Sequence, residues 1–236
     1  MKPLFKRILL KISGEALSGD FHLGLNKDAC DRIASAVHSL HALGVEIGIV
    51  IGGGNFFRGT SAKEFHLNRP SADHIGMLAT MMNGIVLAQA LTDQGMHAVV
   101  MSTMEFGGII EPFNLRIATD ALKNKSIIVF VGGTGHPYFT TDTAAALRAC
   151  EIEADILLKA TKVSGIYNKD PIKFSDAEKY ETLSYAQALS EDLKVMDGAA
   201  IALCKDAAIP IFVFNLFEKN AFIKAVCALE GGTKVS

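Results

Sequence analysis

The sequence predicts an α/β fold, a three-layer αβα sandwich around a mainly parallel central sheet. Strand-like and helix-like segments alternate almost from the first residue to the last, and such alternation is typical of a parallel sheet covered by helices on both faces. The strand-like segments, such as Ile47–Ile51 and Ile127–Val131, are short apolar runs followed by glycine. Runs of this length fit buried strands and are too short to span a membrane.

Capping residues locate the helix ends. Asn26 is a suitable N-cap for an amphipathic helix, and Gly44 lies just past the end of that helix. Ser71 can cap a long helix that Gly95 ends. In chain order, the predicted elements are a strand at Arg7–Lys11, a helix from Asn26, a strand at Val45–Ile51, a helix from Ser71 to Gln94, a strand at Ala98–Met101, a helix at Leu115–Lys123, a strand at Ile127–Val131, a helix opening at Asp142, a strand at Ile156–Ala160, a helix at Gly198–Ala207, a strand at Ile211–Phe214 and a short edge strand within Glu230–Val235.

The length and the lack of a flexible linker favour one domain. The chain has 236 residues, half of them hydrophobic, which is near the upper limit for a single hydrophobic core. We expect one domain over residues 1–236 with an N-terminal lobe of about residues 1–150 and a C-terminal lobe of about residues 151–236. Only Ser164–Tyr180 interrupts the alternation, and its charges and turn residues predict a loop or hairpin between the two halves.

Charge and cysteine content argue against several classes of protein. The formal net charge of −2 leaves no basic surplus for a phosphate backbone, so nucleic acid is not an expected partner. The four cysteines are far apart, which argues against a disulfide framework or a zinc ribbon. His38 and His41 share a helix face without a third ligand, so no protein-held metal site is predicted. The N-terminus lacks a long apolar stretch, and we expect a cytoplasmic protein without a membrane segment.

Two glycine-containing loops follow the first two predicted strands, at the sheet edge where α/β proteins bind ligands. In Lys11–Glu15, a lysine closes a strand beside Gly14; for this stretch alone, a solvent-facing lysine and a turn glycine are the favoured interpretation. In Gly52–Gly59, three glycines precede Arg58. We favour phosphate binding by this second loop, because bare amides and a guanidinium suit an anion, and a tight turn with Arg58 in solvent is the alternative.

Two further loops carry polar groups. Gly132–Asp142 combines glycines and threonine hydroxyls with a predicted helix start, so amides, hydroxyls and the positive end of a helix dipole come together. Thr141 and Asp142 are equally suited to capping that helix. Lys159–Pro171 contains Tyr167 and Asp170, and the residues alone fit a nucleotide pocket and an ordinary hairpin equally well. A Walker A pattern and a complete Rossmann glycine motif are both missing from the sequence.

In this order and spacing, the loops resemble those of the bacterial uridylate kinases, members of the amino acid kinase superfamily. The resemblance runs from Arg7 to Val235. The motifs that carry it are Lys11–Leu17, Val50–Gly59, Asp73–Thr80, Thr134–Thr141, Glu151–Asp155, Lys159–Val163 and Lys194–Asp197. It implies the amino acid kinase-like version of the αβα fold and reversible transfer of the γ-phosphoryl group of ATP to UMP, giving UDP and ADP, in pyrimidine nucleotide (CTP and UTP) biosynthesis.

The same resemblance implies a role for individual residues. The implied catalytic residues are Lys11, Asp142, Asp197 and Arg58. The implied ATP-binding residues are Lys11, Ile12, Ser13, Gly14, Gly54, Arg58, Thr161, Tyr167 and Asp170. The implied UMP-binding residues are Gly53, Asp73, Thr134, Gly135, His136, Pro137, Tyr138, Phe139, Thr140 and Thr141. Mg²⁺ is expected to accompany ATP, and GTP activation, UTP inhibition and a homohexamer are further implications.

Three positions depart from the family pattern. His136 stands where relatives usually carry asparagine, Arg116 is the only arginine in Asn114–Ile117, and Gly19–Gly24 contains fewer glycines than the usual GTP-activation loop. Two other functions remain as alternatives: a carboxylate or carbamate kinase of the same superfamily, and a nucleotide-binding sensor or storage protein without turnover. The joint presence of Lys11, Asp142 and Asp197 argues against the sensor, because a binding protein does not need the complete catalytic set.

Overall fold

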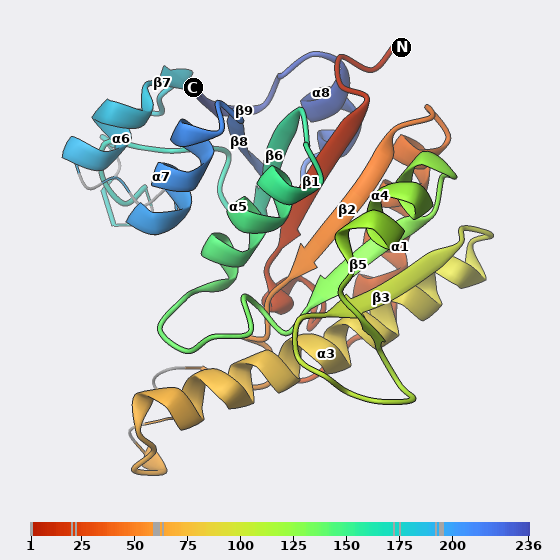
Figure 1. Cartoon of the computed structure of the whole chain (residues 1–236). Helices are drawn as coiled ribbons and strands as arrows, with labels where there is room; N and C mark the ends of the chain where they lie inside the picture. Colours follow the sequence, from red (N-terminus) through yellow and green to blue (C-terminus); the bar gives the residue numbers. More distant parts are fainter. Residues whose placement is uncertain are drawn as a thin grey trace.

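The computed structural model describes residues 2–19, 21, 23–58, 62, 64–171, 173–174, 176–191, 193 and 196–236. Over these residues the strands form one nine-stranded sheet (Figure 1). In sheet order the strands are β4 (Glu111–Pro112), β3 (Ala98–Ser102), β5 (Ile127–Val131), β2 (Glu46–Ile51), β1 (Arg7–Ile12), β6 (Ile156–Thr161), β8 (Ile211–Asn215), β9 (Gly232–Val235) and β7 (Thr182–Leu183).

The strand pairing confirms a mainly parallel sheet. In sheet order, each strand from β4 to β8 is parallel to its neighbour. The exception in the sheet is the pair of β8 and β9, which is antiparallel. The prediction that the C-terminal segment forms an edge strand is wrong. Strand β9 lies between β8 and β7, because the backbone of Thr182–Leu183 adds a further strand beside it.

Helices cover both faces of the sheet, as predicted (Figure 1). The helices α1 (Lys27–His41), α3 (Arg69–Asp93) and α8 (Ala221–Cys227) share one apolar core with the sheet. A second core on the opposite face contains residues of α4 (Leu115–Lys123), α5 (Thr141–Glu151), α6 (Tyr185–Ser190) and α7 (Gly198–Asp206). The three-layer αβα sandwich is therefore confirmed.

Alternation along the central strand shows why the strands read as unbroken apolar runs. Ile8, Leu10 and Ile12 belong to the first core, whereas Leu9 belongs to the second. Successive strand side chains point to opposite faces, and both faces here are covered by helices. A strand buried on both sides needs an apolar residue at nearly every position.

Helix α3 is the longest helix and one of its ends differs from the prediction. Its N-cap is Asn68, whose side chain accepts from the amide of Ser71 at 2.9 Å, so Ser71 itself is not the cap. Pro70 lies in the first turn, where a proline costs no hydrogen bond and its fixed φ suits a helix. That proline places the helix start upstream of Ser71.

By length and composition alone, α3 could cross a membrane, since an 18-residue window in it has a mean hydropathy of 1.5. The sequence predicts this helix, but the short apolar runs considered there did not indicate that its composition is apolar enough to span a membrane. Its window is 56% buried inside the protein. A Cβ built on Gly84 would lie 2.3 Å from Cγ1 of Val131, so the helix approaches the sheet as closely as a glycine allows. We interpret α3 as a core helix.

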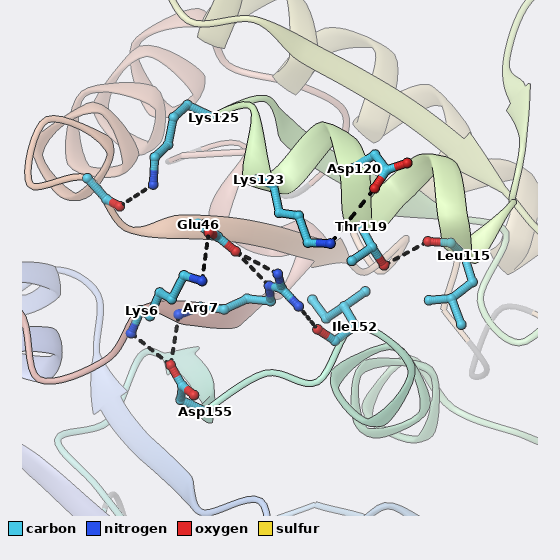
Figure 2. Close-up of polar contacts among 11 residues, drawn as sticks. Lys6, Arg7, Glu46, Leu115, Thr119, Asp120, Lys123, Lys125, Ile152 and Asp155 are labelled. Atoms are coloured by element: carbon cyan, nitrogen blue, oxygen red, sulfur yellow. Dashed lines mark hydrogen bonds and ion pairs between the residues drawn. The ribbon is translucent and has the colours of Figure 1, made fainter.

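A buried ion pair joins the amino-terminal ends of β1 and β2 (Figure 2). Arg7 Nε donates to Glu46 Oε2 at 2.8 Å, and Arg7 Nη1 donates to the carbonyl oxygen of Ile152. The two charged side chains are only 9% and 3% exposed. Asp155 accepts from the backbone amides of Lys6 and Arg7 at 2.7 and 2.8 Å. These contacts hold the amino-terminal ends of β1 and β6 in place. They lie at the edge of the sheet opposite to the carboxyl ends of the strands.

Replacing one partner of this pair should destabilise the fold strongly. We expect Glu46→Ala to lower the free energy of unfolding by about 3–5 kcal/mol, because Arg7 would stay buried without its counter-charge. Urea denaturation measures this loss. The matched control is Asp120→Ala, since Asp120 pairs with Lys123 at 3.9 Å and both side chains are more than half exposed; its loss should stay within about 1 kcal/mol. Equal losses in both variants would contradict the interpretation.

Candidate active site

The four loops singled out in the sequence meet at one edge of the sheet. They follow β1, β2, β5 and β6, and the sheet order β5-β2-β1-β6 makes these strands neighbours. All three pairings among them are parallel, so their carboxyl ends lie on the same side. This is the edge at which open α/β sheets bind ligands.

Two lysines and one aspartate form the charged centre of this edge. Lys11 of β1 and Lys159 of β6 are direct partners in the strand register. Asp142, at the start of α5, pairs through Oδ1 with Lys11 at 2.8 Å and through Oδ2 with Lys159 at 2.7 Å. The three side chains are at most 16% exposed. One carboxylate therefore bridges two ammonium groups from adjacent strands.

Burial and charge act against each other in this triad. Burial raises the pKa of Asp142, but the ammonium groups of Lys11 and Lys159 outweigh it, so the pKa of Asp142 lies below its usual value. Burial lowers the pKa of Lys159, the attraction of Asp142 offsets part of this effect, and the charge of Lys11 adds to the lowering. The carboxylate is therefore ionised at neutral pH and holds the two cations together.

Asp197 is connected to the same centre through hydroxyl groups. It caps α7 by accepting from the amide of Ala200, and it accepts from Thr143 Oγ1 at 2.9 and 3.0 Å. The hydroxyl of Thr140 also donates to Asp197. Thr140 is in turn the N-cap of α5 and accepts from the amides of Asp142 and Thr143. The carboxylate of Asp197 thus fixes the helix start that carries Asp142.

Three cavities lie along this edge, and we name them by position. The α3 cavity has a volume of about 580 Å³ and is lined by Gly53, Gly54, Phe57, Ala62, Leu67, Arg69, Ala72, Asp73, Gly76, Met77, Thr80, Gly133, Phe139, Thr140 and Thr141. The β6 cavity, of about 230 Å³, is lined by Lys11, Ser13, Glu15, Ala16, Lys159, Ala160, Thr161, Lys162 and Leu216. The middle cavity, of about 280 Å³, is lined by Lys11, Thr140, Thr141, Asp142 and Asp197.

The middle cavity shares residues with both of the others. It has Lys11 in common with the β6 cavity and Thr140 and Thr141 in common with the α3 cavity. Two ligands bound in the outer cavities would therefore meet beside Lys11 and Asp142. Such an arrangement suits the transfer of a charged group from one ligand to the other.

The predicted UMP residues lie in two places. Those that line the α3 cavity are Gly53, Asp73, Phe139, Thr140 and Thr141. Thr134, Gly135, His136, Pro137 and Tyr138 do not line it, and the Thr134 hydroxyl bonds instead to the backbone of His136.

Asp73 ties the loop after β5 to the start of α3. Its Oδ2 accepts from the amide of Tyr138 at 2.7 Å, and Arg69 donates to both of its oxygens at 2.9 and 2.7 Å. Tyr138 has a φ of 74°, an uncommon conformation for a residue with a side chain. The bond from Asp73 stabilises this turn, and the ring of Tyr138 lies 5.6 Å from the Arg69 guanidinium.

The predicted ATP residues are also divided. Lys11, Ser13 and Thr161 line the β6 cavity, Gly54 lines the α3 cavity, and Ile12 is buried in β1. Tyr167 and Asp170 line none of the three cavities. They lie in the loop region after β6, where Tyr167 forms an isolated antiparallel β-bridge with Lys179. Arg58 pairs with Glu15 at 2.8 Å and donates to the carbonyl of Gly54 at 3.2 Å. Gly59, Lys194 and Val195, which belong to motifs shared with the uridylate kinases, lie outside the described residues.

Glycine is required where two of the loops cross. A Cβ on Gly14 would lie 2.4 Å from Asn55 Oδ1 and 2.5 Å from the carbonyl oxygen of Gly52. Asn55 and Asn83 are fully buried and exchange two hydrogen bonds of 2.9 and 2.7 Å, and Asn83 also donates to Gly52. This amide pair joins the glycine loop to the middle of α3.

Sequence reasoning missed several residues of the site. Lys159 was assigned no role, although its register opposite Lys11 could have been inferred from two neighbouring strands that each carry a lysine near the carboxyl end. Arg69, Thr143 and Glu15 were also missed. Each acts by binding another charged or polar side chain of the site, and such pairings have no local sequence signal.

Comparison with known proteins identifies the family. The amino acid kinase family matches residues 6–215. The chain is 47% identical to the uridylate kinase of Haemophilus ducreyi over 235 residues, which cover 100% of this chain and 99% of that protein. It is 53% identical to the uridylate kinase of Protochlamydia amoebophila over 223 residues, which cover 93% of this chain and 89% of that protein. The chain belongs to the uridylate kinases.

Solved structures of UMP kinases have the same fold. The enzyme from Bacillus anthracis superposes with a TM-score of 0.94 at 36% identity, covering 98% of this chain and 96% of that one. The enzyme from Ureaplasma parvum gives a TM-score of 0.92 at 35% identity and full coverage of both chains. The likeness to these UMP kinases covers 98% or more of the chain.

Proposed function

We propose that this chain transfers the γ-phosphoryl group of ATP to UMP, reversibly giving UDP and ADP, in pyrimidine nucleotide biosynthesis. The observation that carries the proposal is the middle cavity, which joins the two outer cavities beside Lys11 and Asp142. The names of the relatives supply UMP as the acceptor. The activity belongs in the cytoplasm, where both nucleotides are available.

The two nucleotides take opposite outer cavities in this proposal. UMP occupies the α3 cavity of the N-terminal lobe, residues 1–150, which Gly53, Asp73 and Phe139–Thr141 line. Thr134–Tyr138 lie in the loop between Gly133 and Phe139, two residues that line this cavity. ATP reaches the β6 cavity and the C-terminal lobe, residues 151–236, with Thr161, Tyr167 and Asp170 toward its adenosine. The lining of the cavities supports the places of the residues that line them, Thr161 among them. The roles of Tyr167 and Asp170 rest on the family of the chain.

In the reaction, a phosphate oxygen of UMP forms a bond to the γ-phosphorus while the bond from that phosphorus to the β,γ-bridging oxygen breaks. The UMP phosphate is mostly a dianion at neutral pH because its second pKa is about 6, so no general base has to remove a proton. Lys11 lines the middle cavity, and Lys159 lines the β6 cavity and pairs with Asp142. Both lysines compensate the charge of the transferring group. Asp142 keeps both ammonium groups in place.

Mg²⁺ fits this site as a companion of ATP. Asp142 and Asp197 line the middle cavity with carboxylate oxygens, which are ligands that Mg²⁺ accepts along with nucleotide phosphates. When bound, the ion neutralises charge on the β- and γ-phosphates. Both carboxylates already bind lysines, hydroxyls or an amide. We therefore propose that phosphate oxygens of the nucleotide, and not protein groups, supply most of the ligands of the ion.

The family also suggests regulation, and we propose that GTP activates and UTP inhibits the enzyme. UTP carries the same base and sugar as UMP, so the α3 cavity is its natural site. For GTP, the expected segment is Gly19–Gly24, of which Asp20 and His22 lie outside the described residues. Arg116 is exposed in the first turn of α4 and available to an effector or a partner.

We further propose a homohexamer that uses the outer face of α3. Leu78, Met82 and Ile85 follow one another at intervals of four and three residues and are 42%, 46% and 43% exposed. This spacing places them on one side of the helix. A contiguous apolar stripe of this kind is a common feature of subunit interfaces.

Light scattering tests the assembly. We expect the wild-type mass to be six times that of the 25.3 kDa chain, and Met82→Glu to reduce it, because a charge would be buried in the interface. Leu4→Glu is the control, since Leu4 is 58% exposed and its amide donates to the carbonyl oxygen of Val226 on α8, and it should leave the mass unchanged. A monomeric wild type, or a hexamer that tolerates Met82→Glu, would contradict the proposed interface.

A coupled ADP-release assay tests the activity. With ATP and Mg²⁺, we expect turnover with UMP to exceed that with CMP, dTMP, aspartate and glutamate. Turnover with an amino acid and none with UMP would favour a carboxylate kinase. ATP binding without turnover on any acceptor, with and without GTP, would favour the non-catalytic sensor.

Removing Lys11 should affect the chemical step. We expect Lys11→Ala to lower kcat by about 10²-fold or more, the range found when one electrostatic stabiliser of a transition state is lost. UMP binding, measured by calorimetry, should change little, because Lys11 does not line the α3 cavity. A variant with normal kcat and weak UMP affinity would reassign this lysine to acceptor binding.

A further inference from the structure

Glu15 connects three of the loops at the carboxyl edge of the sheet. It lies in the short 3-10 helix Gly14–Ala16 directly after β1. Its Oε1 pairs with Arg58 Nη2 at 2.8 Å, and its Oε2 pairs with Lys162 Nζ at 3.1 Å. Arg58 follows the glycine loop after β2, and Lys162 follows β6. Since β1 lies between β2 and β6, one carboxylate bridges cations from both neighbouring loops.

Two of these three side chains line the β6 cavity, and Arg58 is connected to it through Glu15. Glu15 and Lys162 line it together with Lys11, Ser13 and Lys159. Three cations and one carboxylate thus contribute to a single small cavity. A carboxylate in such a place repels a polyphosphate, whereas two cations held by that carboxylate are groups that a polyphosphate would bind.

The bridge is exposed enough to exchange its partner. The side chains of Glu15, Arg58 and Lys162 are 31%, 53% and 59% exposed. Ion pairs of this exposure contribute about 0–1 kcal/mol each, so neither pair is needed to hold the fold. A ligand with several phosphate oxygens and more negative charge can therefore replace the carboxylate at both cations.

We propose that Glu15 competes with the phosphates of the donor nucleotide for Arg58 and Lys162, and that Lys162 is a further phosphate-binding residue. The proposal rests on the β6 cavity being the donor site. Its consequence is selectivity: a di- or triphosphate carries enough charge and oxygen atoms to take both cations from Glu15, and a monophosphate such as UMP does not. The donor cavity would thereby disfavour the acceptor nucleotide.

Calorimetric titration with inorganic tripolyphosphate and with ATP tests this competition without requiring turnover. We expect Glu15→Gln to tighten binding of tripolyphosphate by about threefold, the factor that corresponds to about 0.7 kcal/mol of weakened ion pairing. Lys162→Met should weaken binding. In the Lys162→Met background, Glu15→Gln should gain less than in the wild type, because one of the two contested cations is gone.

The matched control is Asp31→Asn, which makes the same change in net charge. Asp31 pairs with Lys27 at 2.5 Å on α1 and is 43% exposed, and it lines none of the three cavities. This variant should bind tripolyphosphate as the wild type does. An equal gain in Asp31→Asn would show that net charge alone acts and would overturn the proposal.

Weaker binding by Glu15→Gln would overturn it as well, since Glu15 would then hold Arg58 and Lys162 in place for the nucleotide. The selectivity has its own measurement, because Glu15→Gln should also show stronger inhibition by UMP competing with ATP. If UMP competes with ATP equally well in Glu15→Gln and in the wild type, the proposed selectivity of the donor cavity is rejected. UMP phosphorylation is assayed in parallel; its failure in the wild type contradicts the proposed function, whereas the tripolyphosphate titrations decide the role of Glu15.

Discussion

The ion pairs of Asp142 with two lysines are the interaction on which the arrangement of this protein depends. Lys11 and Lys159 occupy matching positions on adjacent parallel strands, so their ammonium groups are forced close together and would repel each other. The carboxylate between them offsets this repulsion at a position where little solvent is present to screen it. This requires α5 to begin at one point above the strand ends, and the caps of α5 and α7 hold it there.

The support for Asp142 comes from parts of the chain that are distant in sequence. Asp197, at the start of α7, binds the hydroxyls of Thr140 and Thr143 on α5. At the opposite edge of the sheet, Arg7, Glu46 and Asp155 fix the start of β1 and β6. The positions of both lysines are thus determined at one end by buried polar contacts and at the other by the carboxylate. The chemistry of the site is a consequence of strand register.

Much of this architecture could be predicted from the sequence, because the long elements have local signals. Asn26 caps α1 as expected, accepting from the amide of Ala29, and the apolar runs became the central strands. The short strands β4 and β7 were missed, since two residues carry no periodicity and pair only because a neighbouring strand offers its edge. For the same reason β9 was predicted at an edge that β7 in fact covers.

The site was predictable in its loops and less so in its contacts. Glycine clusters after strands located the cavities, and the family resemblance supplied residue roles. The partners of Asp73 and Arg58 could not be inferred, because Arg69 acts across one helical turn and Glu15 across two loops. A charged residue in a motif indicates that a cation or anion is needed. It does not indicate which neighbour it binds in the folded chain.

The buried pair of Asn55 and Asn83 has a consequence for how distant surfaces of the molecule are coupled. Asn83 lies next in sequence to Met82, so one turn of α3 presents an amide to the glycine loop and an apolar side chain to the outside. The two amides satisfy each other in a solvent-free position, and sliding the helix along its axis would break both bonds at once. The position of the glycine loop is therefore tied to that of the helix. A molecule that bound the outer surface of α3 and displaced the helix would also have to displace Gly53 and Gly54, which line the α3 cavity.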